Sequence, residues 1–387
     1  MPPSSPKPQD RGEAHIRDRG DACPGALRLH RADDGALARL RLPTGVLTPR
    51  QVLLLADASD RLGDGHLSLT SRGNLELRGL GEGCGLGLAD VLREAGLLPS
   101  ERHERVRNMV VSPLAGPDVQ AWAARLDELL CAEDWTPELS GRFLFAVDDG
   151  RGDVAALSPD VTLLAAADGP LLRVADRTYR VAAADAPRAA LAAAEAFLAA
   201  AREAGTGAWR VRELPPGQDV DVTGHLRRAA IAAEPVPDSV RAPSGPPPPG
   251  VIGDDTVSVL ARLGRVTSAQ FRALLPAEEV RVTPWRGFVL PRFADRASAE
   301  ERLRALGEAG FLTRTDSPWI GVTACTGRPG CAKSLSDVRA DARPREGALP
   351  VHWSGCARRC GHPQGTWTDM VATAEGAYQM TVQGSTR

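Results

Sequence analysis

An internal repeat constrains the fold of this chain more than any other feature. Two stretches begin a helix in the same way, with Thr48 and Thr267 as the expected N-caps. Each is followed by an alternating strand and a second helix with similar last residues. The matching pairs are Gly45–Gln51 with Gly264–Gln270, His66–Arg72 with Val280–Arg286, and Leu92–Leu98 with Leu306–Leu312. Three similar elements in the same order indicate two copies of one α+β unit.

The spacing between the copies is 219 residues at the first helix and 214 at the second. In the strands, a spacing of 214 aligns Arg72 with Arg286, whereas a spacing of 213 aligns their threonines. We prefer 214, which predicts that the two arginines occupy matching places. The same spacing aligns the loop that begins at Cys325 with the loop Ser112–Gly116 of the first copy. Ser298 and Glu301 form a capping-box pattern at the start of the second helix of the second copy.

The order strand, helix, strand, helix in each copy predicts an α+β fold with mixed or antiparallel sheets. Between the copies, strands are expected near 161–164 and 171–174, and an alanine-rich helix near 187–203. The proline-rich stretch 234–250 is expected to be a stiff linker. Residues 1–21 have no apolar core of a signal peptide and are expected to be a disordered tail. Because no run of 18 apolar residues occurs, we expect a cytoplasmic protein.

Four cysteines lie close together near the end of the chain. Cys325 and Cys331 form a C-x5-C pair, and Cys356 and Cys360 form a C-x3-C pair. Four thiolates in two close pairs suit an iron–sulfur cluster or a zinc ion, and the wider first spacing favours the cluster. Buried, unligated thiols are the remaining alternative. Pro329 predicts a helix whose positive end would stabilise the thiolates.

The other three cysteines, Cys23, Cys84 and Cys131, lack partners at ligand spacing. We interpret them as small buried residues.

The basic residues are almost all arginine. Lys7 and Lys333 are the only lysines among 47 basic residues, and the formal net charge is −2. This balance argues against a general nucleic-acid or membrane-surface binder. A GC-rich genome explains most of the arginines. A few lie in motifs, and these are the candidates for binding.

The cysteine spacing on the second copy of a duplicated α+β unit resembles the sulfite/nitrite reductase family. This resemblance implies a 4Fe–4S cluster on the four cysteines and two ferredoxin-like half-domains around a central tetrapyrrole site. Leu69–Leu75 is similar to the strand of the family that carries an active-site arginine, here Arg72. Arg107-Asn108 is similar to a second such motif. Arg142 stands where reductases carry a lysine, and Ala357–Arg359 replaces their Pro-Asn-Gly.

These departures resemble the precorrin-3B synthase branch of the family. The motifs shared with this branch are Asp21–Leu27, Ser112–Gly116, Arg142–Asp149, Thr283–Arg286, Ser336–Asp341 and Ser354–Pro363. The resemblance implies O2-dependent monooxygenation of precorrin-3A to precorrin-3B, with hydroxylation at C20 and formation of a γ-lactone. It implies a mononuclear non-haem iron beside the cluster, and an external electron donor such as NAD(P)H through a reductase, or ferredoxin. The sequence does not reveal the ligands of that iron, and His362 is one candidate.

Precorrin-3A carries many carboxylates, which arginine binds with two parallel hydrogen bonds. The expected substrate-binding residues are Arg72, Arg107, Arg142 and Arg286. The alternatives are a siroheme-dependent sulfite or nitrite reductase and a non-catalytic metal-binding protein. The expected divisions of the chain are 1–21 tail, 22–105 first half-domain, 106–233 first reductase-like domain, 234–250 linker, 251–316 second half-domain, and 317–387 second reductase-like domain with the cluster.

Overall fold

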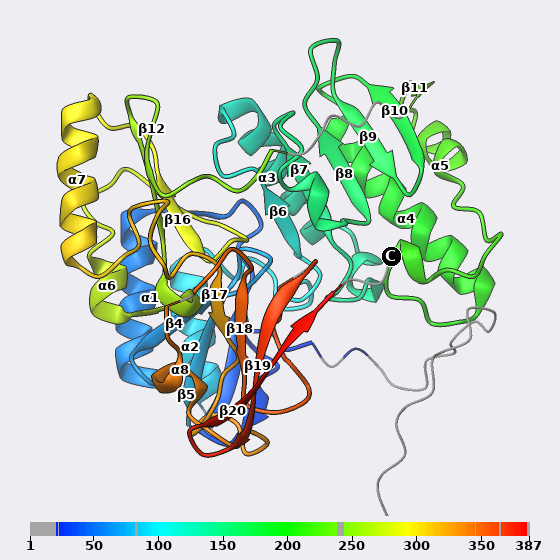
Figure 1. The fold of residues 1–387 in the computed structure, drawn as a ribbon. Coiled ribbons are helices and arrows are strands. Elements are labelled where there is room, and N and C mark those ends of the chain that lie inside the picture. Colours follow the sequence, from blue (N-terminus) through cyan, green and yellow to red (C-terminus); the bar gives the residue numbers. More distant parts are fainter. Residues whose placement is uncertain are drawn as a thin grey trace, which may run out of the picture.

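The computed structural model describes residue 21 and residues 23–81, 84–237, 244–344, 346–363 and 365–384. Within this part of the chain the strands form two five-stranded sheets, one six-stranded sheet and one four-stranded sheet (Figure 1). Helices pack against these mixed and antiparallel sheets, so the predicted α+β class is confirmed. No helix in the described ranges is long and apolar enough to cross a membrane.

The two five-stranded sheets contain the two copies of the repeat. The first has the order β1 (His30–Ala32), β2 (Gly35–Leu40), β5 (Leu75–Leu80), β4 (His66–Leu69), β14 (Arg265–Thr267); the second has the order β12 (Gly250–Ile252), β13 (Thr256–Leu260), β16 (Gly287–Leu290), β15 (Val280–Val282), β3 (Val46–Leu47). Each copy therefore lends one strand to the other copy: β3 pairs with β15, and β14 pairs with β4. The helices of the copies are α1 (Pro49–Leu62), α2 (Cys84–Glu94), α6 (Ser268–Arg272) and α7 (Arg296–Glu308).

The predicted helix starts at Thr48 and Thr267 are confirmed. Each threonine accepts a hydrogen bond from the third residue of its helix, and the side chain of that residue, Gln51 or Gln270, accepts one in return. The prediction at the last helix was wrong. There Asp295 is the N-cap and its partner is Ser298, because the helix begins one turn before the predicted box.

The preferred register of 214 was also wrong. In the first copy, a turn joins Thr70 to Asn74 through a backbone hydrogen bond, and in the second copy the same bond joins Thr283 to Gly287. The structural spacing is thus 213. Arg286 has φ +60° and takes the place of Gly73, whose φ is +64°. The counterpart of Arg72 is Trp285, which packs against a small apolar cluster formed by Val110, Leu144, Ala146 and Val154.

The other two sheets extend the copies. The six-stranded sheet has the order β11 (Ala233–Val236), β10 (Arg177–Val181), β9 (Leu171–Val174), β8 (Val161–Leu164), β7 (Phe145–Asp148), β6 (Met109–Val111), with helices α3 (Pro117–Ala132), α4 (Ala186–Ala204) and α5 (Val222–Arg228). The four-stranded sheet has the order β17 (Val322–Ala324), β18 (Val351–Ser354), β19 (Trp367–Ala374), β20 (Ala377–Gln383), with helix α8 (Val338–Asp341). Short 3-10 helices lie at Thr136–Glu138, Ala155–Leu157, Val211–Glu213 and Arg262–Gly264. In the six-stranded sheet β6, β7 and β8 run parallel to one another. In the four-stranded sheet β17, β18 and β19 do the same.

The strands predicted at 161–164 and 171–174 are confirmed, and so is the alanine-rich helix. The predicted linker 234–250 differs from the structure at both ends. Its first residues belong to β11, which pairs with β10, and its last residue begins β12. Residues 238–243 and the predicted tail at 1–20 lie outside the described residues.

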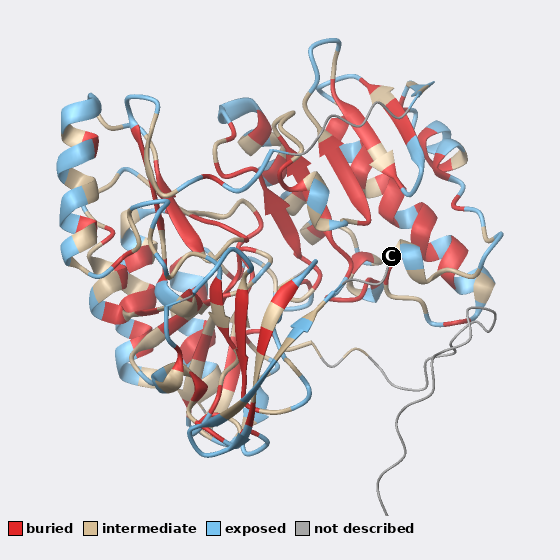
Figure 2. Cartoon of the chain, in the orientation of Figure 1, coloured by how far each residue is buried: buried red, intermediate tan, exposed pale blue. Residues whose placement is uncertain are grey.

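The copies of the repeat share one hydrophobic core. It joins residues of both copies, including Leu47 from the lent strand β3 and Phe288 from β16, both fully buried. A second core lies under the six-stranded sheet, where most alanines of α4 are buried (Figure 2). The two predicted half-domains therefore share one hydrophobic core.

The shared core predicts that truncating the lent strand destabilises both copies together. Leu47→Ala should lower the free energy of unfolding by about 2–5 kcal/mol, because it opens a cavity in a fully buried site. Urea unfolding followed by circular dichroism measures the change. Leu86→Ala is the control, because Leu86 is 76% exposed. Two separate transitions in the Leu47 variant, with only one shifted, would contradict a shared core.

Candidate functional site

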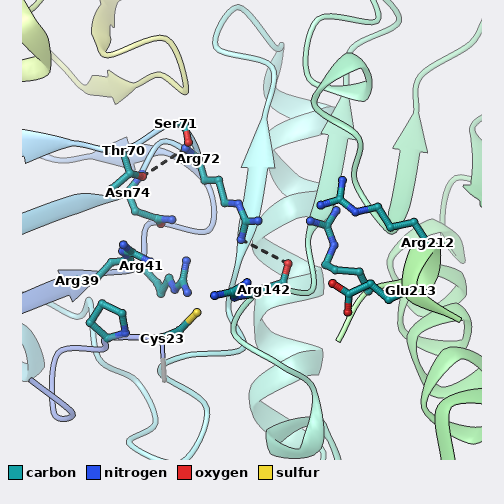
Figure 3. A pocket seen from close by; sticks show the side chains of 12 residues that line it. Cys23, Arg39, Arg41, Thr70, Ser71, Arg72, Asn74, Arg142, Arg212 and Glu213 are labelled. Carbon is teal, nitrogen blue, oxygen red and sulfur yellow. Dashed lines mark hydrogen bonds between the residues drawn. The ribbon is translucent and has the colours of Figure 1, made fainter. Parts of the chain in front are cut away.

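A cavity of about 430 Å³ lies between the first copy of the repeat and the six-stranded domain. One wall comes from β2 and the Thr70–Asn74 turn, and the other from residues 210–213 with Arg142 (Figure 3). Six arginines line it, together with Cys23, Glu213 and a few small residues; the arginines are Arg39, Arg41, Arg72, Arg142, Arg210 and Arg212. So many cations around one cavity indicate an anionic ligand.

Three of these arginines are held by protein groups. Arg39 forms an ion pair with Glu76 at 2.6 Å, and Arg210 forms one with the buried Asp160. Arg41 is buried and donates only to neutral groups, the side-chain oxygen of Asn108 at 2.5 Å and the carbonyl of Gly141 at 2.9 Å. Burial, with the charges of Arg39 and Arg72, lowers the pKa of Arg41 to about 9.

The other three arginines have no carboxylate within ion-pair distance among the described residues. Arg72 reaches across the cavity to the carbonyl of Arg142 at 3.4 Å (Figure 3). The guanidinium of Arg142 lies 4.9 Å from the Trp209 ring. Burial and the charge of Arg210 lower the pKa of Arg72 to about 10. Arg212 is exposed at the rim. A ligand with several carboxylates would offset this excess of positive charge.

The structure brings two of the four predicted arginines, Arg72 and Arg142, to the cavity. It places Arg107 elsewhere: its guanidinium is buried and bound by both oxygens of Asp127 and by the carbonyl of Leu97. Arg286 lies beside the cysteine loops, where it donates to the carbonyl of Gly361 at 3.1 Å. We therefore leave Arg107 out of the substrate site.

Four cavity arginines were missed from the sequence: Arg39, Arg41, Arg210 and Arg212. Arg39 and Arg41 alternate with leucine on one strand, and this pattern could have identified them. Nothing in the local sequence connects residues 210–212 with β2, because only the packing of the two domains brings them together.

The cysteine loops begin at the ends of neighbouring parallel strands. Cys325 directly follows β17, and Cys356 follows β18 by two residues. In the ladder, Ala324 pairs with Trp353, so both strands deliver their cysteines to the same edge of the sheet. The amide of Gly355 donates to Cys325 Sγ at 3.2 Å, and its carbonyl accepts from Leu335 at 2.9 Å. A Cβ at Gly355 would lie 1.8 Å from Ser334 Oγ, so the loops meet only because this residue is glycine.

The first copy of the repeat holds the segment that carries Cys331. Arg78 on β5 pairs with Asp34 at 3.0 Å and donates to the carbonyl of Gly330 at 2.8 Å. Asp33, in the same hairpin turn, accepts from the amide of Ala332. The main chain on both sides of Cys331 is thus fixed by the β1–β2 hairpin.

The predicted helix at Pro329 is absent from the described structure. Residues 328–333 form turns, and helix α8 begins only at Val338. The positive field at the cysteines therefore comes from side chains and amides. Burial raises the pKa of Cys325, and nearby Cys360 raises it further, whereas the amides of Gly355 and Gly327 and the charge of Arg339 lower it. Thiols lose their protons when a metal binds them.

Two histidines lie near these loops. His352 on β18 is fully buried, its Nδ1 lies 2.8 Å from Thr323 Oγ1, and burial lowers its pKa to about 3. His362 is exposed, and its ring stacks on Trp367 at 4.7 Å with its Nδ1 2.8 Å from its neighbour's carbonyl. Among the described residues, neither histidine belongs to a group of three ligand atoms within 4.8 Å of one another, and no three of the four cysteines form such a group either.

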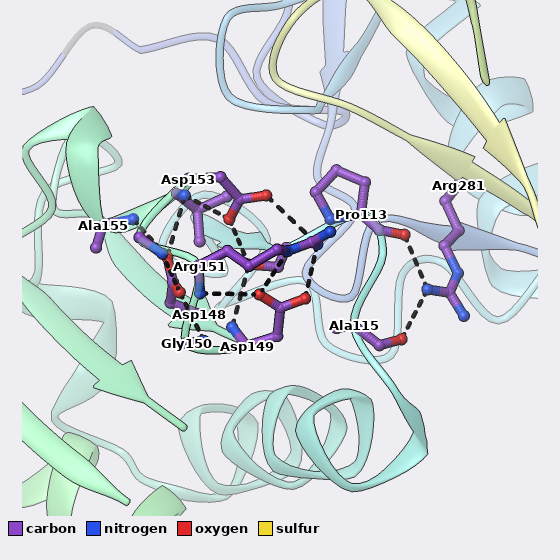
Figure 4. A network of polar contacts seen from close by, with 12 residues as sticks. Pro113, Ala115, Asp148, Asp149, Gly150, Arg151, Asp153, Ala155 and Arg281 are labelled. Atoms are coloured by element: carbon purple, nitrogen blue, oxygen red, sulfur yellow. Dashed lines mark hydrogen bonds and ion pairs between the residues drawn. The ribbon is translucent and has the colours of Figure 1, made fainter. Parts of the chain in front are cut away.

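An acidic loop occupies the equivalent place in the first copy. Ser112 follows β6 as Cys325 follows β17, and the oxygens of Asp148, Asp149 and Asp153 lie within 4.8 Å of one another (Figure 4). The Asp148 carboxylate accepts from four backbone amides, and the Asp149 carboxylate pairs with Arg151. Ser112 donates to Asp153 at 2.5 Å. Because these carboxylates are already bound by protein groups, they do not fit an open iron site, and we derive no step from one.

Comparisons with known proteins agree with this geometry. Residues 29–83 match the model of the nitrite/sulfite reductase ferredoxin-like half domain. The Mycobacterium tuberculosis NirA protein has the same fold, with a TM-score of 0.64 at 18% identity over 90% of this chain and 73% of that chain. The fold is therefore that of nitrite/sulfite reductases, as the repeat and the cysteine spacing predicted.

The sequence comparisons find relatives in two branches of this fold. The chain is 27% identical to the precorrin-3B synthase of Sinorhizobium sp over 97% of its length and 85% of that protein. It is 26% identical to the ferredoxin–nitrite reductases of Synechococcus elongatus and Leptolyngbya laminosa, over 85% of its length and 74% of each. The resemblance to precorrin-3B synthase is thus confirmed.

The cysteine loops predict that the four thiols act as one ligand set. Cys325→Ser should abolish cluster binding, because serine is a poor ligand for iron in such a site. Iron and acid-labile sulfide per chain, measured after anaerobic purification, give the result, and Cys331→Ser, Cys356→Ser and Cys360→Ser should behave alike. Cys131→Ser is the control outside the loops. Full iron and sulfide content in all four variants would show that the ligand set is wrong.

Proposed function

We propose that this protein is an oxidoreductase that converts precorrin-3A to precorrin-3B in aerobic cobalamin biosynthesis. One oxygen atom of O2 is added at C20. The other oxygen atom takes up two electrons and two protons and is released as water. A γ-lactone forms from a ring-A acetate. The similarity to precorrin-3B synthase over 97% of the chain supports this assignment.

The observation that carries the proposal is the arginine-lined cavity. Three guanidinium groups there, those of Arg72, Arg142 and Arg212, have no carboxylate partner among the described residues, and Arg41 is buried against neutral groups only. A substrate with many carboxylates supplies the missing negative charge at several points at once. Binding at several points fixes its orientation, which is the main contribution a protein can make to an oxygenation at one ring carbon.

Cys325, Cys331, Cys356 and Cys360 would hold the 4Fe–4S cluster, which supplies single electrons when it is bound. The chain's own residues keep this region in place. Arg78 and Asp34 fix the loop around Cys331, and Gly355 lets the two loops approach closely. The resemblance implies an external electron donor for the cluster, either ferredoxin or NAD(P)H through a reductase.

A siroheme-dependent sulfite or nitrite reductase is the second candidate, because nitrite reductases cover 85% of the chain at similar identity. The residues of the cavity favour the first candidate. Its cations are all arginine, which suits carboxylates, and Lys333 is the only lysine in the described chain and does not line the cavity. Strong Soret-type absorption from bound siroheme in the purified protein would favour the reductase.

Aerobic turnover of precorrin-3A tests the proposal directly. We expect the iron-loaded protein, with a reductant and O2, to yield a product that has gained one oxygen atom, as measured by mass spectrometry. With ¹⁸O2 the added atom should be labelled. Under argon the product should not form. Unchanged precorrin-3A in the aerobic reaction would refute the assignment.

The cavity predicts a binding defect for Arg72→Met. Removing a charged hydrogen-bonding partner of a carboxylate should weaken precorrin-3A binding about 10–100-fold, because such a bond contributes roughly 1.5–3 kcal/mol. Substrate-induced absorbance changes under anaerobic conditions measure the affinity. Arg50→Met is the matched control, since Arg50 pairs with Glu94 on the exposed surface. Equal affinities of the Arg72 variant and the control would exclude Arg72 from the substrate site.

A further inference from the structure

Two arginines beside the cysteine loops form no ion pair within the part of the chain that the structure describes. Arg286 donates to the carbonyl of Gly361, which follows Cys360, and Arg339 donates to the carbonyl of Leu263 at 3.3 Å. No carboxylate of the described chain lies within ion-pair distance of either guanidinium. A partly buried guanidinium without an anionic partner is costly, so a negative charge is expected nearby.

Neighbouring cations make this expectation stronger. Burial lowers the pKa of Arg339, and the positive charges of Arg265, Arg286 and Arg78 lower it further. Arg78 and Arg265 have carboxylates of their own, Asp34 and Asp64. Among the strongest influences on the pKa of Arg339, the thiol of Cys325 is the one that favours the charged form. The positive charge of Arg339 therefore acts on the cysteine site.

The backbone also favours this placement. Arg286 adopts a left-handed φ of +60° where the first copy of the repeat has glycine. A Cβ at Gly264 would lie 2.4 Å from Arg286 Cδ, so glycine at this position leaves room for the arginine side chain. Strained non-glycine residues persist where the surroundings hold them, and they are common at functional sites.

We propose that Arg286 and Arg339 are the counter-charges of the iron–sulfur cluster and raise its reduction potential. The inference rests on the cluster of the proposed function. Four thiolates give the cluster a net negative charge. An external donor adds one electron, and so one more negative charge, without making or breaking a bond. Fixed positive charges nearby stabilise the reduced form more than the oxidised form.

A redox titration of the full-length holoprotein followed by electron paramagnetic resonance tests this proposal, with dithionite as reductant. Arg339→Met should lower the ratio of reduced to oxidised cluster at a fixed potential about tenfold, which corresponds to about 59 mV for a one-electron couple. Arg286→Met should act in the same direction. Arg339→Lys keeps the charge and should stay near the wild-type potential.

Arg343→Met is the matched control, because Arg343 lies next to the same helix, is exposed and donates only to main-chain carbonyls. Its potential should equal that of the wild type. Wild-type potentials in both methionine variants with full cluster content would overturn the proposal, as would equal shifts in Arg339→Met and Arg339→Lys. If Arg339→Met loses the cluster, retention in Arg339→Lys supports a charge effect, and loss in both overturns it.

The titration requires no precorrin, so it is independent of the substrate assignment. Wild-type protein without iron and sulfide would contradict both the cluster and its counter-charges. Unshifted potentials in a protein that oxygenates precorrin-3A would contradict the counter-charges alone.

Discussion

The exchange of strands between the two copies of the repeat is the constraint on which the rest of the structure depends. Strand β3 completes the sheet of the second copy, and β14 completes that of the first. Because the lent strands bury residues such as Leu47 in a common core, neither copy has a complete sheet alone. The turns at Thr70–Asn74 and Thr283–Gly287 are thereby fixed relative to each other. One turn faces the arginine cavity, and the other faces the cysteine loops.

The two copies share a scaffold but differ in the residues at their loops. Ser112 stands where the second copy has Cys325, Gly73 stands where it has Arg286, and Arg72 stands where it has Trp285. The loop after β7 is closed by carboxylate–amide bonds, whereas the loop after β18 carries two cysteines. The duplicated framework thus carries cysteine loops in one copy and a cavity-lining arginine, Arg72, in the other. Function here lies in the loops, and the sheets position them.

Unneutralised positive charge marks both sites. Among the described residues, Arg72 and Arg142 in the cavity have no carboxylate partner, and neither do Arg286 and Arg339 beside the cysteines. Elsewhere many arginines form ion pairs, such as Arg107 with Asp127. The arginine-rich composition therefore hides a functional minority, which is recognised by the absence of a partner and not by residue type.

The sequence by itself determined what depends on local chemistry. Capping threonines, alternating strands and the alanine-rich helix follow from short-range preferences. The cysteine spacing predicts a metal site because the four cysteines are near one another in the chain. The tertiary structure decided what depends on contacts between distant residues. The spacing of 213 rests on a turn hydrogen bond in each copy, the strand exchange links segments over 200 residues apart, and Arg107 is neutralised by Asp127 on another element. Whether a charged side chain meets a ligand or a partner within the protein is settled by packing, which no local pattern records.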